Sequence, residues 1–167
     1  MTLPASLVAA VDGPASPGRR RLLVGCGLLG LGRMALSASV DLPVAVSLPL
    51  HLAAALRQGN PLVVMVSLPG CPFCRVAREN YLAPMLREQQ LPIVQVDMQS
   101  KQVLRAFSGA DVTHERQIEE WRIRIAPTVL FFGPQGVEVA ERLVGAMVPD
   151  FYGAYLEQRL ATARKAL

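Results

Sequence analysis

Two of the three cysteines in this chain of 167 residues lie three positions apart, in the stretch SLPGCPFCRVARENYL at residues 67–82. Cys71 and Cys74 form this C-x-x-C pair. The spacing fits a catalytic dithiol, one half of a zinc site or a purely structural disulfide. Each alternative makes a different demand on the rest of the chain, so the surrounding sequence helps to separate them.

A zinc site built on this pair requires further ligands, usually four in all. The chain has only two histidines, His51 and His114, and neither lies at a metal-ligand spacing. A structural disulfide is also a poor explanation. Disulfide scaffolds normally have several bridges, and a bridge that closes so short a loop stabilises a chain least. The pair is therefore predicted to serve chemistry, and no metal is expected.

Cys71 is expected to begin a helix, because the buried-strand pattern PLVVMVSL at residues 61–68 ends just before it. Pro72 suits the first helical position, where a missing N–H costs nothing. A nucleophilic cysteine reacts as the thiolate, and the free N–H groups and dipole of a helix N-terminus favour that anion. Cys71 is thus the predicted nucleophile.

Cys74 lies one turn deeper and is expected to be more shielded, which suits the thiol that resolves a mixed disulfide formed on Cys71. Arg75, one turn after Cys71, is placed to add positive charge near the nucleophile. Arg78 is interpreted as solvated helix surface.

The remaining sequence predicts alternating helices and strands. Helices are expected at residues 48–58, 72–90, 100–125 with a break at 108–111, and 149–165. Strands are expected at 61–68 and 91–98 and in a hairpin across 127–145 with its turn at 133–136. Two strands joined by a crossover helix should be parallel, whereas a hairpin adds antiparallel strands. The pattern therefore predicts an α/β fold, with a central mixed β-sheet and helices on both faces.

Some expectations concern single helices. Thr113 is a predicted N-cap, and Ile118, Trp121 and Ile125 are spaced for one helical face. The predicted apolar stripe of the last helix consists of Tyr152, Tyr155, Leu156 and Leu160.

A second feature supports the catalytic interpretation. The sequence IAPT at residues 125–128 places Pro127 at the start of a buried strand, where proline is otherwise poorly tolerated. C-x-x-C after a buried strand, then Pro-Thr before VLFF, a G-x-x-G hairpin and a final amphipathic helix resemble the thioredoxin superfamily over roughly residues 45–165. The resemblance implies a thioredoxin-like fold in which Pro127 is cis and faces the dithiol. It also implies that Ala126 offers its backbone to an extended substrate, and the residues expected to contact substrate are Pro72, Phe73, Ala126, Pro127 and Thr128.

The chain departs from the cytosolic thioredoxin pattern in two ways. That branch keeps an acidic residue on the preceding strand as a proton acceptor, whereas this chain has Met65 or its neighbours there, so the proton acceptor for Cys74 is unassigned. Strongly oxidising relatives often have histidine where this chain has Phe73, which adds no charge to stabilise a thiolate. The long helix before Pro84 looks more like exported thioredoxin-like proteins, including those linked to sulfur-compound oxidation, cytochrome maturation or disulfide reduction.

The N-terminal segment has the order of an export signal. GRRRLLVGCGLLGLGRMALSAS places three arginines before a short apolar stretch and small residues. Residues 1–39 are therefore the expected signal, of the general secretory or twin-arginine type, with cleavage near Ala38–Val40. The third cysteine, Cys26, lies in its apolar stretch and would be discarded with it. Lipidation of Cys26 or a retained membrane anchor are minor alternatives.

The sequence pI of about 9.3 comes from this segment, because four arginines and only one acidic residue lie before residue 40, which leaves 17 − 4 = 13 basic and 13 − 1 = 12 acidic residues after it. The mature region has no basic stripe interleaved with aromatics. No nucleic-acid partner is expected. We read residues 40–167 as one thioredoxin-like domain: a periplasmic, monomeric thiol–disulfide oxidoreductase acting on protein or small-thiol substrates. Its only redox group would be the Cys71–Cys74 disulfide, reduced by a membrane electron donor. A disulfide donor or isomerase, or a non-catalytic redox-sensing module that binds one client, are the alternatives that the sequence leaves open.

Overall fold

The central sheet has four strands in the order β2-β1-β5-β6. A computed structural model describes residues 41–146 and 149–167, so the expected signal and its cleavage position lie outside the described residues. Strand β1 (Leu62–Ser67) runs parallel to β2 (Ile93–Asp97) and antiparallel to β5 (Thr128–Phe132). Strand β6 (Leu143–Val144) pairs antiparallel with β5. The predicted mixed sheet is confirmed.

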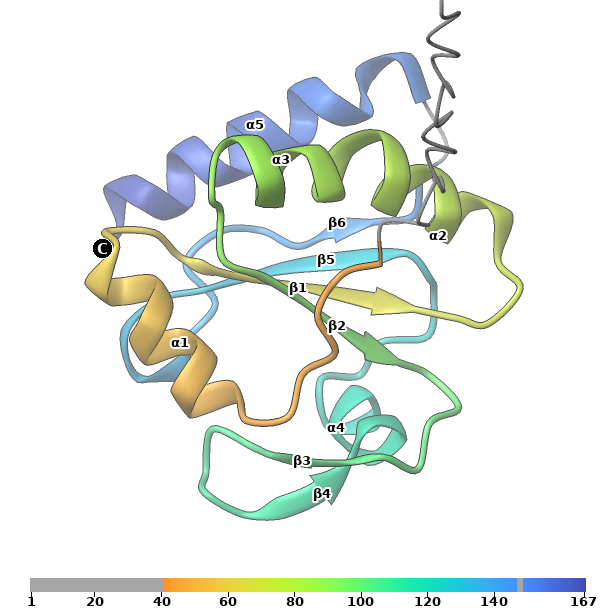
Figure 1. Cartoon of the computed structure of the whole chain (residues 1–167), viewed down its shortest axis with the longest axis vertical. Coiled ribbons are helices and arrows are strands. Elements are labelled where there is room, and N and C mark those ends of the chain that lie inside the picture. The colour runs from red at the N-terminus through yellow and green to blue at the C-terminus, as the bar shows by residue number, and fades with distance from the viewer. Residues whose placement is uncertain (1–40, 147–148) are drawn as a thin grey trace, which may run out of the picture. The chain divides into compact units, whose positions relative to one another are not determined.

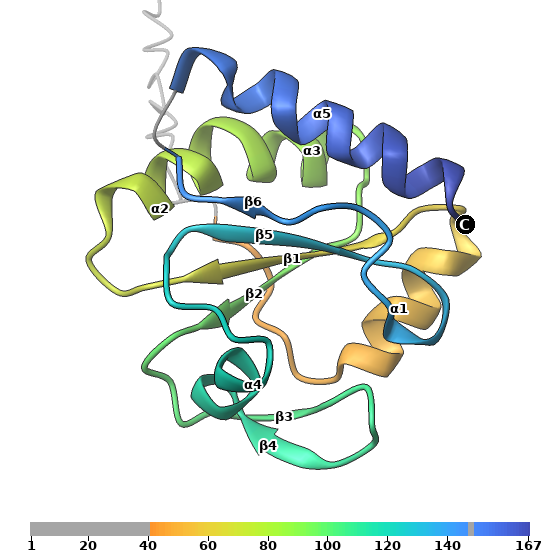
Figure 2. The same cartoon turned by 180° about the vertical axis from the view of Figure 1, so that it is seen from behind.

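Helices cover both faces of this sheet (Figure 1, Figure 2). One face carries α1 (Leu48–Arg57) and α4 (His114–Glu120), and the other carries α2 (Pro72–Ala77), α3 (Ala83–Glu88) and α5 (Pro149–Lys165). Every residue of β1 is buried, and alternate residues serve different cores. Val63 and Met65 pack in the core beneath α2, α3 and α5, whereas Val64 and Val66 pack beneath α1 and α4. This two-sided burial explains why β1 is a continuous apolar run.

The helix expected at 72–90 is interrupted. Between α2 and α3, residues Arg78–Leu82 form a π-helical turn, η1. Pro84 has no N–H to donate to the carbonyl of residue 80, and the widened turn comes directly before it. Because of this interruption α2 ends at Ala77, and Arg78 is the first residue of η1.

The expected helix at 100–125 is wrong over its first half. Strands β3 (Val103–Arg105) and β4 (Asp111–Thr113) form an antiparallel hairpin there. Gly109, in the predicted helix break, has a φ of 85°, which suits a tight turn better than a helix. The guanidinium of Arg105 pairs with Asp111 across the hairpin and closes it.

The helix that follows begins as predicted but ends early. Thr113 caps α4, because its hydroxyl accepts the N–H of Arg116 at 3.2 Å. Ile118 is buried as expected, but α4 ends at Glu120, and Arg122 takes a positive φ of 57°. Ile125 lies beyond this reversal and is exposed, so its predicted place on the buried helical face is wrong.

The C-terminal elements follow the prediction closely. The hairpin between β5 and β6 turns at Gly133–Gly136, where a 3-10 turn η2 (Pro134–Gly136) forms. Tyr152, Leu156 and Leu160 of α5 are buried, and the stripe continues at Ala163 with a spacing of three to four residues. Tyr155 lies off that stripe and is exposed, which corrects its predicted burial. No helix within residues 41–146 and 149–167 is long and apolar enough to cross a membrane.

Candidate active site

Cys71 lies at the N-cap of α2, as predicted. The loop from β1 turns at Gly70, whose φ of 74° is the left-handed conformation that favours glycine. The backbone N–H of Cys71 donates to the carbonyl of Leu68 at 3.2 Å. Its Sγ accepts the N–H of Cys74 at 3.1 Å, in the position that a serine or aspartate oxygen occupies in other N-caps. The sulfur therefore faces a free N–H of the helix, the group that stabilises a thiolate there.

Cys74 has a different environment one turn further on. Its side chain is 0% exposed and belongs to the core beneath α2, α3 and α5. Burial raises the pKa of Cys74 to about 11, and a hydrogen bond to Cys71 adds to the rise. Hydrogen bonds from the N–H of Leu68 and from Ser67 act in the opposite direction on this pKa. Both cysteines are free thiols in this structure, and Cys74 is protonated at neutral pH.

The loop before β5 brings a distant segment to the nucleophile. The Ala126–Pro127 peptide bond is cis, as the resemblance implied. The thiol of Cys71 donates to the carbonyl of Ala126, with sulfur and oxygen 3.9 Å apart. Pro127 is buried, and its carbonyl accepts the N–H of Gly145 at 2.7 Å, which ties the loop to β6. Residues more than fifty positions apart thus meet at one sulfur atom.

The remaining predicted contact residues fall into two groups. Pro72 and Phe73 lie at the surface, and Phe73 presents an apolar ring that is 58% exposed beside Cys71. Thr128 is buried, and its hydroxyl donates to the carbonyl of Ile125 at 2.7 Å. The side chain of Thr128 therefore holds the cis-proline loop in place. Because it is buried, it cannot make the predicted contact with substrate.

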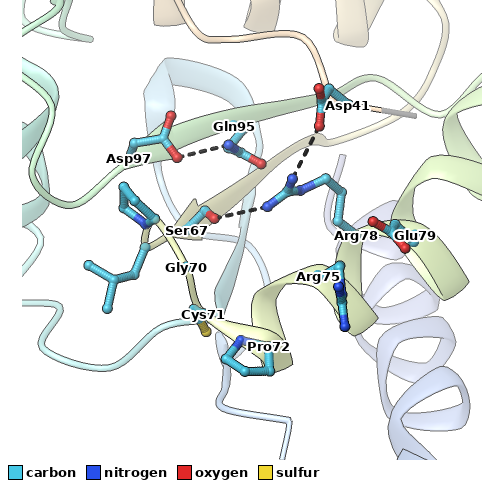
Figure 3. A pocket seen from close by; sticks show the side chains of 12 residues that line it. Asp41, Ser67, Gly70, Cys71, Pro72, Arg75, Arg78, Glu79, Gln95 and Asp97 are labelled. Atoms are coloured by element: carbon cyan, nitrogen blue, oxygen red, sulfur yellow. Dashed lines mark hydrogen bonds and ion pairs between the residues drawn. The ribbon is translucent and has the colours of Figure 1, made fainter. Parts of the chain in front are cut away.

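A polar cavity of about 450 Å³ adjoins the start of α2 (Figure 3). Arg78 lies at its side with only 19% of the side chain exposed, so its interpretation as solvated surface is wrong. One guanidinium nitrogen pairs with Asp41 at 3.2 Å, and another donates to the hydroxyl of Ser67 at 3.4 Å. Figure 3 shows the guanidinium between these two partners.

Sequence reasoning missed the group of Ser67, Arg78 and Asp41. Two signals point to it in retrospect. Ser67 is the one hydroxyl in an otherwise apolar run directly before the C-x-x-C motif, and Arg78 lies four residues after Cys74, on the same helical face. Asp41 gives no such signal, because only the folded chain brings it near α2.

The surroundings of both histidines suit a structural role. His114 is fully buried, and its Nδ1 accepts the N–H of Asp97 at 3.2 Å. Its ring proton is therefore assigned to Nε2, which donates to the carbonyl of Ala45 at 2.9 Å. His51 lies on α1, and burial lowers its pKa. No cluster of His, Cys, Asp and Glu able to hold a metal ion is present among the described residues.

The fold and the pairing of Cys71 with a cis-proline define a thioredoxin-like protein. The family model of the thioredoxin-like domain matches residues 48–160, and the chain belongs to that family. No curated protein sequence matches the chain.

Several solved structures are similar to the fold of this chain. Thioredoxin h from poplar shares 20% identity, with 66% of this chain and 86% of that chain covered and a TM-score of 0.48. Mitochondrial thioredoxin 3 from Saccharomyces cerevisiae shares 16% identity, with 74% and 98% covered and a TM-score of 0.49. The periplasmic thioredoxin SoxS from Paracoccus pantotrophus shares 20% identity, with 62% and 98% covered and a TM-score of 0.42. At these identities and TM-scores the likeness carries no functional detail.

Proposed function

We propose that this protein is a thiol–disulfide oxidoreductase that uses Cys71 as nucleophile and Cys74 as resolving cysteine. The observation that carries the proposal is the position of Cys71 Sγ. It accepts the N–H of Cys74 at 3.1 Å and lies 3.9 Å from the carbonyl of Ala126, next to the cis-proline. Attack on an extended disulfide substrate requires a thiolate at a helix N-cap and a backbone carbonyl beside it.

The reaction has two exchange steps. The Cys71 thiolate attacks one sulfur of a substrate disulfide, that bond breaks, and the other substrate sulfur leaves as a thiolate. Cys74 then attacks Cys71 Sγ in the mixed disulfide, forms the Cys71–Cys74 bond and releases the second substrate thiol. Two electrons pass from the dithiol to the substrate, and the protein ends as the disulfide.

The surroundings of the dithiol favour the reducing direction. Phe73 brings no charge to Cys71, and Cys74 is a buried, protonated thiol at neutral pH. A dithiol is a strong oxidant only when its reduced form is specially stabilised, as by a charged donor to the nucleophile. We therefore assign this protein to reduction of protein or small-molecule disulfides.

The N-terminal pattern supports an exported, periplasmic location, with residues 40–167 as the working domain. An oxidising compartment does not keep a dithiol reduced. The proposal therefore includes a membrane partner that returns two electrons to the Cys71–Cys74 disulfide after each turnover. On the length of the helical segment before Pro84, we place the chain with exported thioredoxin-like proteins, including the branch linked to sulfur-compound oxidation, and treat it as a monomer.

Trapping of the mixed disulfide tests the assignment of the two cysteines. In a Cys74→Ser variant the second exchange step is blocked, so partners should accumulate on Cys71 as adducts that dithiothreitol releases. Non-reducing gels and mass spectrometry of the full chain, expressed in a bacterial host, detect them. Cys71→Ser and the double variant are the controls and should trap nothing. If Cys74→Ser traps no more than the double variant does, the pair is a structural clip and the enzyme proposal fails.

A further inference from the structure

The resolving step requires Cys74 to lose its proton in a place where burial opposes the charge. Strand β1, which the structure describes in full, contains no carboxylate. Met65 packs in the core with Cys74 and cannot accept a proton. The group that assists ionisation of Cys74 has to come from elsewhere.

Ser67, the last residue of β1, provides a polar contact. Its side chain is 1% exposed and, by the alternation of the strand, lies on the same face of β1 as Met65, which packs in one core with Cys74. A hydrogen bond from its hydroxyl also lowers the pKa of Cys74. The same oxygen accepts a guanidinium N–H of Arg78 at 3.4 Å. A hydroxyl has one hydrogen to donate, and Arg78 takes up acceptor capacity on the oxygen. The hydroxyl hydrogen is therefore free to point at the sulfur, which is the orientation that stabilises a thiolate.

Arg78 adds a fixed positive charge to this contact. One guanidinium nitrogen of Arg78 pairs with Asp41 Oδ1 at 3.2 Å, and this ion pair keeps the other nitrogen on the hydroxyl of Ser67. The Nε atom of Arg78 is buried without a partner among the described residues, so Asp41 and Ser67 are what fixes the group. The ion pair and the hydrogen bond therefore hold Arg78 against the hydroxyl of Ser67.

The polar cavity connects this contact to solvent. Ser67, Arg78 and Asp41 line it together with Cys71, and a volume of about 450 Å³ accommodates several water molecules. Figure 3 shows Ser67 and Arg78 facing one another at this cavity, with Asp97 and Glu79 also on its wall. In the proposed step the hydroxyl hydrogen stays on Ser67, and water in the cavity, which Ser67 and Cys71 line, accepts the proton of Cys74.

We propose that Ser67 is a catalytic hydrogen-bond donor to Cys74 in the resolving step and that Arg78, fixed by Asp41, is its positioning residue. This inference rests on the proposed function. In the step, the Cys71–substrate S–S bond breaks and the Cys71–Cys74 bond forms. The proton of Cys74 goes to water in the cavity, and the departing substrate thiolate takes up a proton from solvent. No further oxidant or reductant enters.

Other groups also face Cys74. They are Cys71 in the same helix, Tyr152 from α5, Tyr81 from η1 through Tyr152, and the N–H of Leu68. Burial raises the pKa of Tyr152, and the charges of Cys74 and Tyr81 add to the rise, so Tyr152 is a neutral phenol at neutral pH. Its hydroxyl is buried without a partner among the described residues. Tyr152→Phe is therefore a matched control that removes a neighbouring hydroxyl not bonded to the sulfur.

The test separates the two exchange steps with 5,5′-dithiobis(2-nitrobenzoate). Attack by Cys71 releases one coloured thiolate, and attack by Cys74 on the adduct releases the second, so stopped-flow absorbance follows both phases from pH 6 to 10. For Ser67→Ala we expect the second phase to slow at least about tenfold at pH 7, because a hydrogen bond to a charged group is lost. Below the pKa of Cys74, which is about 11, the second-phase rate rises with pH, so Ser67→Ala should need a pH about one unit higher to reach the same second-phase rate. The first phase should stay within about twofold.

Graded variants extend the test. Ser67→Thr keeps the hydroxyl and should restore the second phase to within about threefold of the wild-type rate. Arg78→Gln and Asp41→Asn should shift the pH dependence of the second-phase rate in the same direction by smaller amounts. Asp41 is 70% exposed, so its variant carries the test even if a change at buried Ser67 impairs folding. Tyr152→Phe should leave both phases unchanged.

Either of two outcomes overturns the inference. One is a second phase in Ser67→Ala with the wild-type rate at every pH from 6 to 10, and the other is an equal change in Tyr152→Phe. In both cases a normal first phase in the wild-type protein leaves the proposed function standing. Absence of both phases in the wild-type protein would instead refute the proposed function itself.

Discussion

Cys71 and Cys74 show how position alone separates two identical side chains. Cys71 is half-buried and caps a helix, where its sulfur accepts a backbone N–H. Cys74 is buried within one turn of it, where loss of water stabilises the neutral thiol. A spacing of three residues thus places one sulfur on a backbone N–H at a helix N-cap and the other in the core, where burial opposes the anion. The chemistry of the pair depends on that difference.

The environment of Cys74 predicts how the stability of the reduced protein varies with pH. Its pKa is raised from 9.0 to about 11 on folding, so the folded state holds the proton more tightly than the unfolded state. The resulting stability is fully present below about pH 9 and is lost as the pH rises towards 11. We expect the reduced wild-type protein to lose about 2 kcal/mol across that range relative to Cys74→Ser, which has no thiol to ionise there. Urea unfolding at pH 8 and pH 10.5 measures this difference, and equal losses in both proteins would contradict it.

At the scale of elements, the junction between β1 and α2 positions the site. The strand is buried on both faces and ends at Ser67, and the chain then turns at Gly70 into the N-cap of α2. Gly70 has a positive φ and open space around its Cα, so an added methyl group would meet conformational strain rather than a clash. The position of Cys71 therefore depends on a backbone conformation that glycine alone adopts readily.

Gly70→Ala tests this dependence, with Gly59→Ala as the matched control. Gly59 also has a positive φ, of 67°, and open space, and it lies in the turn after α1. Each variant should lose about 1–2 kcal/mol of stability, the cost of a left-handed conformation in a residue with a Cβ. Only Gly70→Ala should also slow attack by Cys71, by about tenfold, in the first phase of the exchange assay. Equal first-phase rates in the two variants would show that Gly70 does not set the position of the nucleophile.

Most elements of the sheet and its helices could be predicted because their patterns are local. A continuous apolar run marks β1, and the Gly133–Gly136 turn marks the hairpin that follows β5. The sequence does not predict the β3–β4 hairpin because its strands are only three residues long and only Leu104 among them is buried, too short a stretch to show an apolar period of two. The dithiol and Pro127 could be named from sequence, but the Asp41–Arg78–Ser67 contact could not. This contact joins residues from three segments. In the sequence its charged residues have the pattern of a solvent-exposed helix face, and only the packing of the helical segment on β1 shows that Arg78 is largely buried.

At the scale of the whole molecule, segments that are far apart in the sequence come together at the end of β1 to form the site. The dithiol follows β1, the cis-proline precedes β5, and the Arg78 group connects η1 to the start of the described chain at Asp41. The family match identifies the fold, and this convergence supports the proposed reactive centre. The direction of electron flow is a property of the whole molecule too, since it depends on which redox state of the dithiol the surrounding fold stabilises.

The reduction potential of the Cys71–Cys74 couple tests the central claim most directly. Equilibration of the full chain with glutathione redox buffers at pH 7, with thiol alkylation and mass spectrometry as the readout, measures it. The uncharged Phe73 and the buried, protonated Cys74 predict a two-electron couple below about −200 mV, in the range of reducing proteins of this class. A potential above about −150 mV, in the range of strong disulfide donors, would contradict the reductase assignment.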